Sequence, residues 1–130
     1  MATKKRRFGV SLPTEMADCL DQLASKLGVD RSSLIEDALK EYIHDHLHYL
    51  RPHKCMGVMI IIAHRMHQGI HGILERYKDI VSQYNHLHIG EKCIETMIIF
   101  GDSDKIAKLH EELGEAGCRI RYIPLAYELE

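Results

Sequence analysis

The first part of the chain alternates apolar and polar side chains over a short stretch and then changes to a helical period. Apolar residues occupy every second position of residues 7–12, which predicts a strand with one buried face. After Pro13, an apolar stripe with helical spacing predicts a helix that ends at Gly28. Asp30 is placed to cap a second helix, which we expect to run to about residue 48. A strand and two helices of this size cannot bury enough apolar surface alone, so we expect an obligate dimer whose two strands pair.

The remaining residues alternate between strand and helix patterns. Apolar runs predict the strands, and apolar stripes at helical spacing predict the helices between them. The expected elements are a strand over 55–63, a helix over 64–77, strands over 80–89 and 93–100, a helix over 104–113, and a strand over 119–126. This β-α-β-β-α-β order is that of ferredoxin-like folds, so the expected fold class is α+β. We expect domains at 1–48 and 55–130, joined by a linker at 49–54.

Composition and charge limit the cellular compartment and the kinds of site that we expect for this chain. The formal net charge of −2 gives no overall positive field, although residues 4–7 are all basic. The four cysteines are widely spaced and form no Cys-x-x-Cys pair, which argues against a structural zinc finger or a redox motif. The longest apolar run, residues 56–63, has the length of a strand, and no apolar signal region follows the basic start. We therefore expect a reducing, cytoplasmic setting and no association with membranes.

The main candidate for chemistry is His86-Leu87-His88, followed by Cys93 after a short turn. Alternate side chains of a strand share a face, so the two imidazoles point the same way and a thiolate can reach the same point. Two imidazoles and a thiolate suit nickel, copper, zinc or cobalt, and do not suit calcium or magnesium. The ten histidines of the chain, many for its length, favour this interpretation. A strand with two solvent-facing histidines and a buried cysteine remains the alternative.

A second group lies on the helix predicted over residues 64–77. His64, His67, His71 and Glu75 have spacings that place them on one face of that helix. This stripe could supply a further ligand or form a second site. It could equally be a solvated helix face that binds nothing.

Several segments together make the chain resemble a known family, the nickel-responsive repressors of the NikR type. At the N-terminus the resemblance rests on residues 7–12, Gly28 and residues 30–35. In the second half it rests on the segments Asp79-Ile-Val, His86-Leu-His88-Ile, Cys93-Ile-Glu95 and Phe100-Gly-Asp102. The resemblance implies a ribbon-helix-helix DNA-binding domain joined to a ferredoxin-like, ACT-type metal-sensing domain.

The resemblance also implies a ligand set. His86, His88 and Cys93 would come from one subunit, and the family completes a planar site with a histidine from a neighbouring subunit. In this chain the corresponding position is Glu75, so the implied set contains two imidazoles, a thiolate and a carboxylate. Nickel is the ion that the resemblance implies, while zinc, cobalt and copper stay open because such a set also fits them.

The implied partners are double-stranded operator DNA and further copies of the chain, in a homotetramer built as a dimer of dimers. The outward positions of the N-terminal strand would read base edges, and basic or capping residues would contact phosphates. The candidates for base contacts are Arg7, Gly9 and Ser11, and those for phosphate contacts are Lys5, Arg31 and Ser32.

These observations predict a metal-responsive transcription regulator, a repressor that controls transition-metal homeostasis. The alternative is a ribbon-helix-helix repressor that senses a small organic ligand, such as an amino acid, through its ACT-like domain. An enzyme is not expected, because the sequence contains no nucleophile and base at a recognisable spacing and no phosphate-binding glycine loop.

Overall fold

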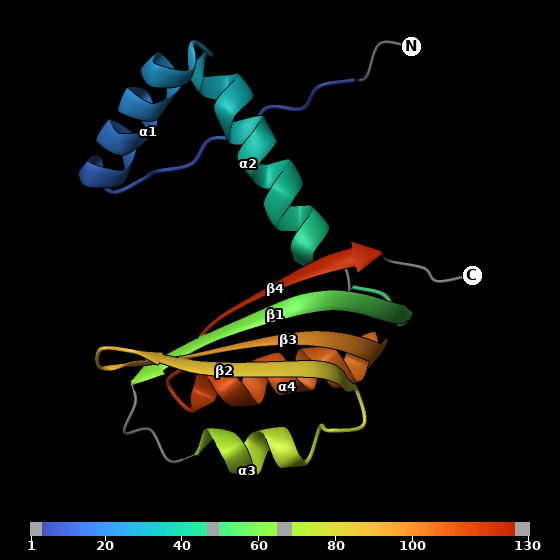
Figure 1. The fold of residues 1–130 in the computed structure, drawn as a ribbon. Coiled ribbons are helices and arrows are strands. Elements are labelled where there is room, and N and C mark those ends of the chain that lie inside the picture. Colours follow the sequence, from blue (N-terminus) through green and yellow to red (C-terminus); the bar gives the residue numbers. More distant parts are fainter. Residues whose placement is uncertain (1–3, 47–49, 65–68, 127–130) are drawn as a thin grey trace. The chain divides into compact units, whose positions relative to one another are not determined.

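The chain forms two compact units, Met1–Glu41 and Tyr42–Glu130. The computed structural model describes residues 4–46, 50–64 and 69–126 (Figure 1). Domain boundaries at 48 and 55, with a linker between them, stay a prediction. None of the helices in the described ranges is long and apolar enough to span a membrane.

The first unit is built around two helices, α1 (Thr14–Leu27) and α2 (Arg31–His46), the second of which runs on into the other unit. Gly28 ends α1 in the left-handed conformation, with φ of 68°, and its N–H donates to the carbonyls of the last helical turn. At the start of α2, the Ser33 N–H donates to Asp30 Oδ1 at 2.7 Å. Gly28 therefore ends α1 and Asp30 caps α2, as the sequence predicts.

Residues 4–13 form neither helix nor strand within the single chain, in contrast to the strand expected over 7–12. The apolar side chains of this segment are not buried: Phe8 is 79% exposed and Val10 is 76% exposed. Across the described part of the first unit, Ala24 is the one buried side chain. A strand needs a hydrogen-bonded neighbour and a surface to cover, and one copy of this unit contains neither.

The second unit is a four-stranded antiparallel sheet with two helices. Its elements are β1 (Lys54–His64), α3 (Ile70–Glu75), β2 (Val81–Ile89), β3 (Lys92–Asp102), α4 (Ser103–Glu115) and β4 (Arg119–Ala126). The strand order is β2-β3-β1-β4, with every neighbouring pair antiparallel. This order is the ferredoxin-like arrangement, and the expected α+β class is confirmed.

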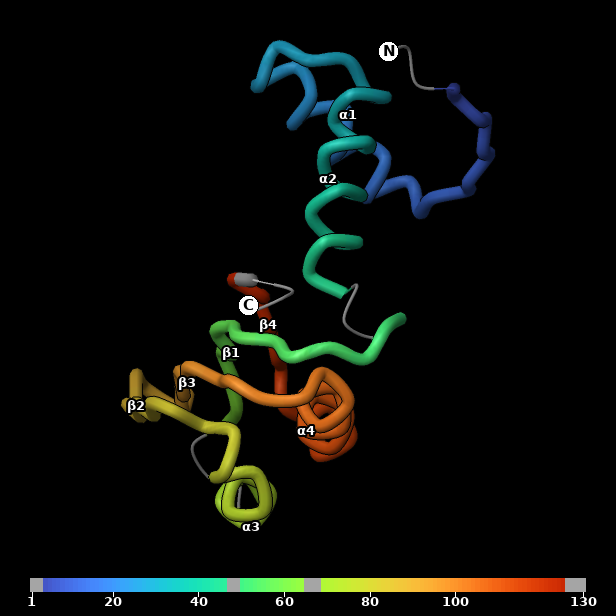
Figure 2. Tube along the Cα trace, turned by 90° about the vertical axis from the view of Figure 1, so that its right-hand side faces the viewer, coloured from blue at the N-terminus to red at the C-terminus, as the bar shows by residue number. Residues whose placement is uncertain are grey.

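Both helices lie on the same face of the sheet, and Figure 2 shows them nearly end-on beneath the strands. Alternate residues of β1 and β3 point into the layer between sheet and helices, as strand geometry requires. The fully buried side chains of this layer include Met59, Ile61, Met97, Ile99, Ile106, Leu109 and Leu113. The core of the second unit therefore lies on the face that also carries Cys93 and Glu95.

The helix expected over 64–77 is wrong at its start. His64 is the last residue of β1 and pairs with Lys92 of β3, while α3 covers only Ile70–Glu75. His64 extends the ladder between β1 and β3, and a helical pattern in the local sequence cannot reveal such pairing with a distant strand. The proposed helical stripe loses His64 as a result, and His67 lies outside the described residues.

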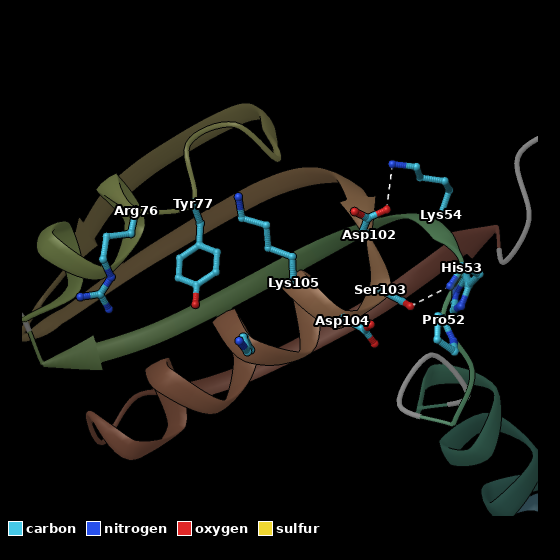
Figure 3. A pocket seen from close by; sticks show the side chains of 10 residues that line it. Pro52, His53, Lys54, Arg76, Tyr77, Asp102, Ser103, Asp104 and Lys105 are labelled. Carbon is cyan, nitrogen blue, oxygen red and sulfur yellow. Dashed lines mark hydrogen bonds and ion pairs between the residues drawn. The ribbon is translucent and has the colours of Figure 1, made fainter.

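The start of β1 is tied to the start of α4 by Ser103, which is fully buried. The Ser103 N–H donates to the His53 carbonyl at 2.8 Å, and the His53 N–H donates to Ser103 Oγ at 2.9 Å (Figure 3). We call this reciprocal pair the His53–Ser103 link. It fixes the point at which the chain enters the sheet.

Candidate metal centre

The candidate centre lies where β2, the edge strand, pairs with β3. The register places His88 opposite Cys93 and His86 opposite Glu95. Because directly opposite residues of an antiparallel pair share a face, these four side chains project from the same side of the sheet. Cys93 and Glu95 belong to the buried alternation of β3, so this is the side that the helices cover.

The donor atoms of the first candidate group are in mutual contact. His86 Nε2 is 2.9 Å from His88 Nε2 and 3.1 Å from Cys93 Sγ. Cys93 is buried, His86 is half-buried and His88 is exposed, so the group is open on the solvent side of β2. The sequence spacing predicted that these three side chains face one point, and the structure brings them together.

Two further residues contact this group, and the spacing argument missed both. Glu95 is 1% exposed, and its Oε1 accepts a hydrogen bond from the Tyr84 hydroxyl at 2.9 Å. The same oxygen lies 3.5 Å from His86 Nδ1. A charged residue in an otherwise apolar buried alternation, between Cys93 and Met97, was the sequence signal that could have identified Glu95.

Comparison with known proteins identifies both halves of the chain. Residues 4–46 match the ribbon-helix-helix domain, and residues 56–117 match the NikR C-terminal nickel binding domain. A protein of Methanocaldococcus jannaschii, provisionally named a nickel-responsive regulator, is 30% identical over 118 residues, which are 85% of this chain and 84% of the relative. A relative from Methanosarcina acetivorans with the same kind of name is 32% identical over 121 residues, which are 87% of this chain and 86% of the relative. The chain belongs to the nickel-responsive regulator family.

A solved structure has a similar fold over part of this chain. An uncharacterized protein of Thermotoga maritima matches it with a TM-score of 0.54 at 18% identity, covering 56% of this chain and 99% of its own. At that identity the likeness shows the fold alone.

Burial favours the protonated forms of two groups at the candidate centre, the Cys93 thiol and the Tyr84 hydroxyl. Removal from water raises the pKa of the Cys93 thiol, and the nearby Glu95 carboxylate raises it further. Desolvation also raises the pKa of the Tyr84 hydroxyl, which donates to the same carboxylate. Both groups are therefore protonated at neutral pH, so a cation that binds the Cys93 sulfur must displace a proton.

Glu75 and His71 lie on α3, next to this group. Glu75 is exposed and forms an ion pair with Lys78 at 2.9 Å, and within one chain it does not join the donor cluster. The His71 ring stacks on the His86 ring with a centroid distance of 6.1 Å. Of the predicted helical stripe, His71 is thus the member that the structure places beside the candidate centre.

The predicted DNA contacts lie in the first unit, and all of them are exposed. Lys5, Arg7, Gly9 and Ser11 belong to the segment that forms no strand in the single chain, and Ser32 lies in the first turn of α2. Arg31 Nε donates to Asp21 Oδ1 at 2.8 Å, so a phosphate would have to compete with that carboxylate for this guanidinium.

A separate hollow of about 720 Å³ lies beside the His53–Ser103 link (Figure 3). Its lining contains four cations, Lys54, Arg76, Lys105 and Lys108, and the first three form ion pairs with carboxylates. The pairs are Lys54 with Asp102 at 2.8 Å, Arg76 with Glu112 at 3.0 Å, and Lys105 with Asp79. The hollow therefore presents little uncompensated charge to an anion.

Proposed function

We propose that the chain is a transcription regulator that binds operator DNA and that responds to a transition-metal ion, with nickel as the first candidate. The observation that carries this proposal is the convergence of His86, His88 and Cys93 on one point at the edge of the sheet. The membership of the chain in the nickel-responsive regulator family supports it. We further propose that it acts in the cytoplasm as a repressor.

The spacing of the three donor atoms fits a metal ion. With bonds of about 2.05 Å to nitrogen and 2.3 Å to sulfur, ligands at about 90° lie about 2.9 Å apart for two nitrogens and about 3.1 Å for nitrogen and sulfur. Tetrahedral angles would require about 3.3 Å and 3.6 Å. The observed separations of 2.9 Å and 3.1 Å match the right-angle values, although they are also hydrogen-bond lengths. Right angles are those of planar nickel or copper, so these separations are compatible with the ion that the family resemblance implies.

The fourth ligand is proposed to be Glu75 of a neighbouring subunit. The group is open beside His88, and Glu75 is exposed on α3, where another copy of the chain can reach it. A carboxylate in this position replaces the histidine that the family resemblance implies. It would add a negative charge to a set that already contains the thiolate of Cys93, so the bound divalent ion would be neutralised.

The first unit is proposed to dimerise through paired strands at residues 7–12. Phe8, Val10 and Leu12 are exposed in the single chain, and a second copy would cover them. Arg7, Gly9 and Ser11 would then face outward from the ribbon towards the major groove. Among them, Arg7 can donate two hydrogen bonds to a guanine, whereas Gly9 contributes no side chain. Lys5, together with Arg31 and Ser32 at the start of α2, would contact phosphates.

Two such dimers on a tetrameric core of second units would hold four DNA-reading segments. A bound ion would supply a cross-link between subunits through His86, His88, Cys93 and Glu75. This cross-link can change the DNA affinity only by the difference in ion affinity between the DNA-bound and free arrangements. The change in DNA affinity caused by the ion therefore depends on how well these four side chains align across the subunit boundary.

The test is nickel-dependent DNA binding by the full chain. A random-sequence duplex library is enriched for binding in the presence of nickel, and the enriched duplexes are used in mobility-shift assays. Cys93→Ala and His86→Ala should each weaken nickel binding by at least about tenfold, because even residues outside the ligand shell cost 10–100-fold. Both variants should also lose the nickel-dependent part of DNA binding.

Cys19→Ala is the matched control, because Cys19 is an exposed thiol in α1, outside the candidate centre. It should bind nickel and DNA as the parent chain does. The proposal fails if Cys93→Ala and His86→Ala both retain parental nickel affinity and nickel-dependent DNA binding.

A further inference from the structure

The Glu95 carboxylate has one oxygen without a partner. Its side chain is 1% exposed, and Oε2 makes no hydrogen bond with any residue that the structure describes. The other oxygen, Oε1, accepts from Tyr84 and lies near His86. A buried carboxylate oxygen without a donor or a cation is costly, and few native structures contain one without a reason. The lack of a partner for Glu95 Oε2 is the first observation that points to a second cation position.

His86 presents its two ring nitrogens to two different groups. Nε2 faces His88 and Cys93, at 2.9 Å and 3.1 Å. Nδ1 faces the other way, towards the Tyr84 hydroxyl at 3.3 Å and Glu95 Oε1 at 3.5 Å. The ring of His71 stacks beside that of His86 on the same side. Donor atoms of His71, His86 and Glu95 all lie within 4.8 Å of one another.

We propose that His71, His86 and Glu95 form a second cation position within one chain, which competes with the first position for His86. The second position uses a carboxylate where the first uses the Cys93 thiolate. It does not depend on the proposed function, and only the competition between the positions relates the two.

The ligand set indicates which ions the second position would take. His86 Nδ1 and Glu95 Oε1 lie 3.5 Å apart, which is close enough for both to bind one ion, because two bonds of about 2.1 Å span at most about 4.2 Å. Two imidazoles and a carboxylate are ligands of zinc and cobalt, and tetrahedral coordination suits both. The first position has right-angle spacing and a sulfur, so the two positions would select different ions.

An ion can reach the second position from solvent. A hollow of about 280 Å³ opens beside α3, and its lining includes His71, Tyr84, Glu75 and Lys78. The Tyr84 hydroxyl lies between this hollow and the Glu95 carboxylate, to which it donates. Glu75 and Lys78 also line this hollow and form an ion pair at 2.9 Å, so together they add no net charge to the approach to His71.

The competition follows from the chemistry of imidazole. A neutral imidazole has one lone pair available, on either Nδ1 or Nε2, and carries a proton on the other nitrogen. An ion at the second position takes the Nδ1 lone pair, so Nε2 is protonated and cannot bind an ion at the first position. Occupation by zinc or cobalt would therefore oppose occupation by nickel.

The experiment removes the first position and asks what remains. Cobalt is titrated into the full-length double variant His88→Ala/Cys93→Ala, and its visible absorption is followed. We expect tetrahedral cobalt bands without the thiolate-to-cobalt charge-transfer band. Adding His71→Ala or Glu95→Gln should weaken this binding by at least about tenfold. His71 is exposed and Gln keeps the shape of Glu95, so both variants should fold, which circular dichroism checks.

His64→Ala in the same double variant is the control, because His64 is an exposed histidine at the end of β1. It should leave the cobalt bands unchanged. The inference is overturned if the double variant binds no tetrahedral cobalt, or if His71→Ala and Glu95→Gln leave its cobalt affinity unchanged. Either result leaves the nickel tests on Cys93→Ala and His86→Ala unaffected, so the two proposals can fail separately.

Discussion

Replacing Gly57 by alanine should destabilise the second unit by a predictable amount. Gly57 lies on β1, where a Cβ would be 2.5 Å from the Tyr122 ring and 2.6 Å from the backbone oxygen of Ile123. Carbon atoms in contact prefer about 3.5–4.0 Å, so β4 would have to move by about 1 Å. The backbone oxygen of Ile123 cannot rotate away, because Gly57 and Pro124 are paired in the ladder between β1 and β4.

The size of the effect follows from two contributions. Overpacking of a core costs about 1–3 kcal/mol. Moving Tyr122 also breaks the contact of its hydroxyl with Cys55 Sγ, which is 3.0 Å long, and a buried hydrogen bond contributes about 1 kcal/mol. Gly57→Ala should therefore lower the free energy of unfolding by about 2–4 kcal/mol.

Urea unfolding of the full chain at one fixed protein concentration measures this change. Gly114→Ala is the matched control, since Gly114 lies in α4 and a Cβ there meets no atom within 4 Å. The same substitution should there stabilise by about 0.5–1 kcal/mol, because alanine is the better helix former. Equal midpoints for Gly57→Ala and the parent chain would refute the close approach of β1 and β4.

Two other predictions concern the first unit and the fourth ligand. Asp30→Ala should lower the melting temperature of the parent chain at neutral pH, whereas Asp30→Asn should retain most of the cap. The bond from the Ser33 N–H lowers the pKa of Asp30, so its stabilisation is present above the pKa of the unfolded chain and is lost as the pH falls through the lower folded value. Circular dichroism melts at several pH values measure this, and an equal Asp30→Ala effect at all pH values would contradict it. Glu75→His should raise nickel affinity, since an imidazole favours planar nickel more than a carboxylate does. Equilibrium dialysis tests this, and unchanged or weaker affinity would mean that Glu75 is not the fourth ligand.

Much of the second unit could be predicted from the sequence, because its strands have an unambiguous period. The strands expected over 55–63 and 93–100 differ from β1 and β3 by only one or two residues at each end. The helix predicted over 64–77 contains α3 but is wrong at its start, because His64 pairs with β3 instead. Hydrogen bonds to a distant strand are not part of a local pattern, so periodicity could not reveal this boundary.

At the candidate centre too, local spacing predicts which residues of one segment share a face but not which residues of another strand they contact. His86, His88 and Cys93 could be grouped from spacing alone, because alternation and a tight turn determine that they share a face. Tyr84 shares a face with His86 by the same alternation, but the contact of Glu95 with His86 depends on the register between β2 and β3. A shift of one residue would move Glu95 to the opposite face of the sheet. In the first unit, the strand over 7–12 depends on a second chain, which no single copy can supply.

The His53–Ser103 link has a mechanical consequence. Cys93 lies near one end of β3, and Ser103 directly follows the other end. At about 3.4 Å per residue, the stretch between them measures on the order of 30 Å. Because β3 is extended and pairs with both β1 and β2, we expect it to resist stretching and to move as one rigid segment. We therefore expect a shift of β3 along its own axis to displace Ser103 and, through the link, the backbone of His53 just before β1.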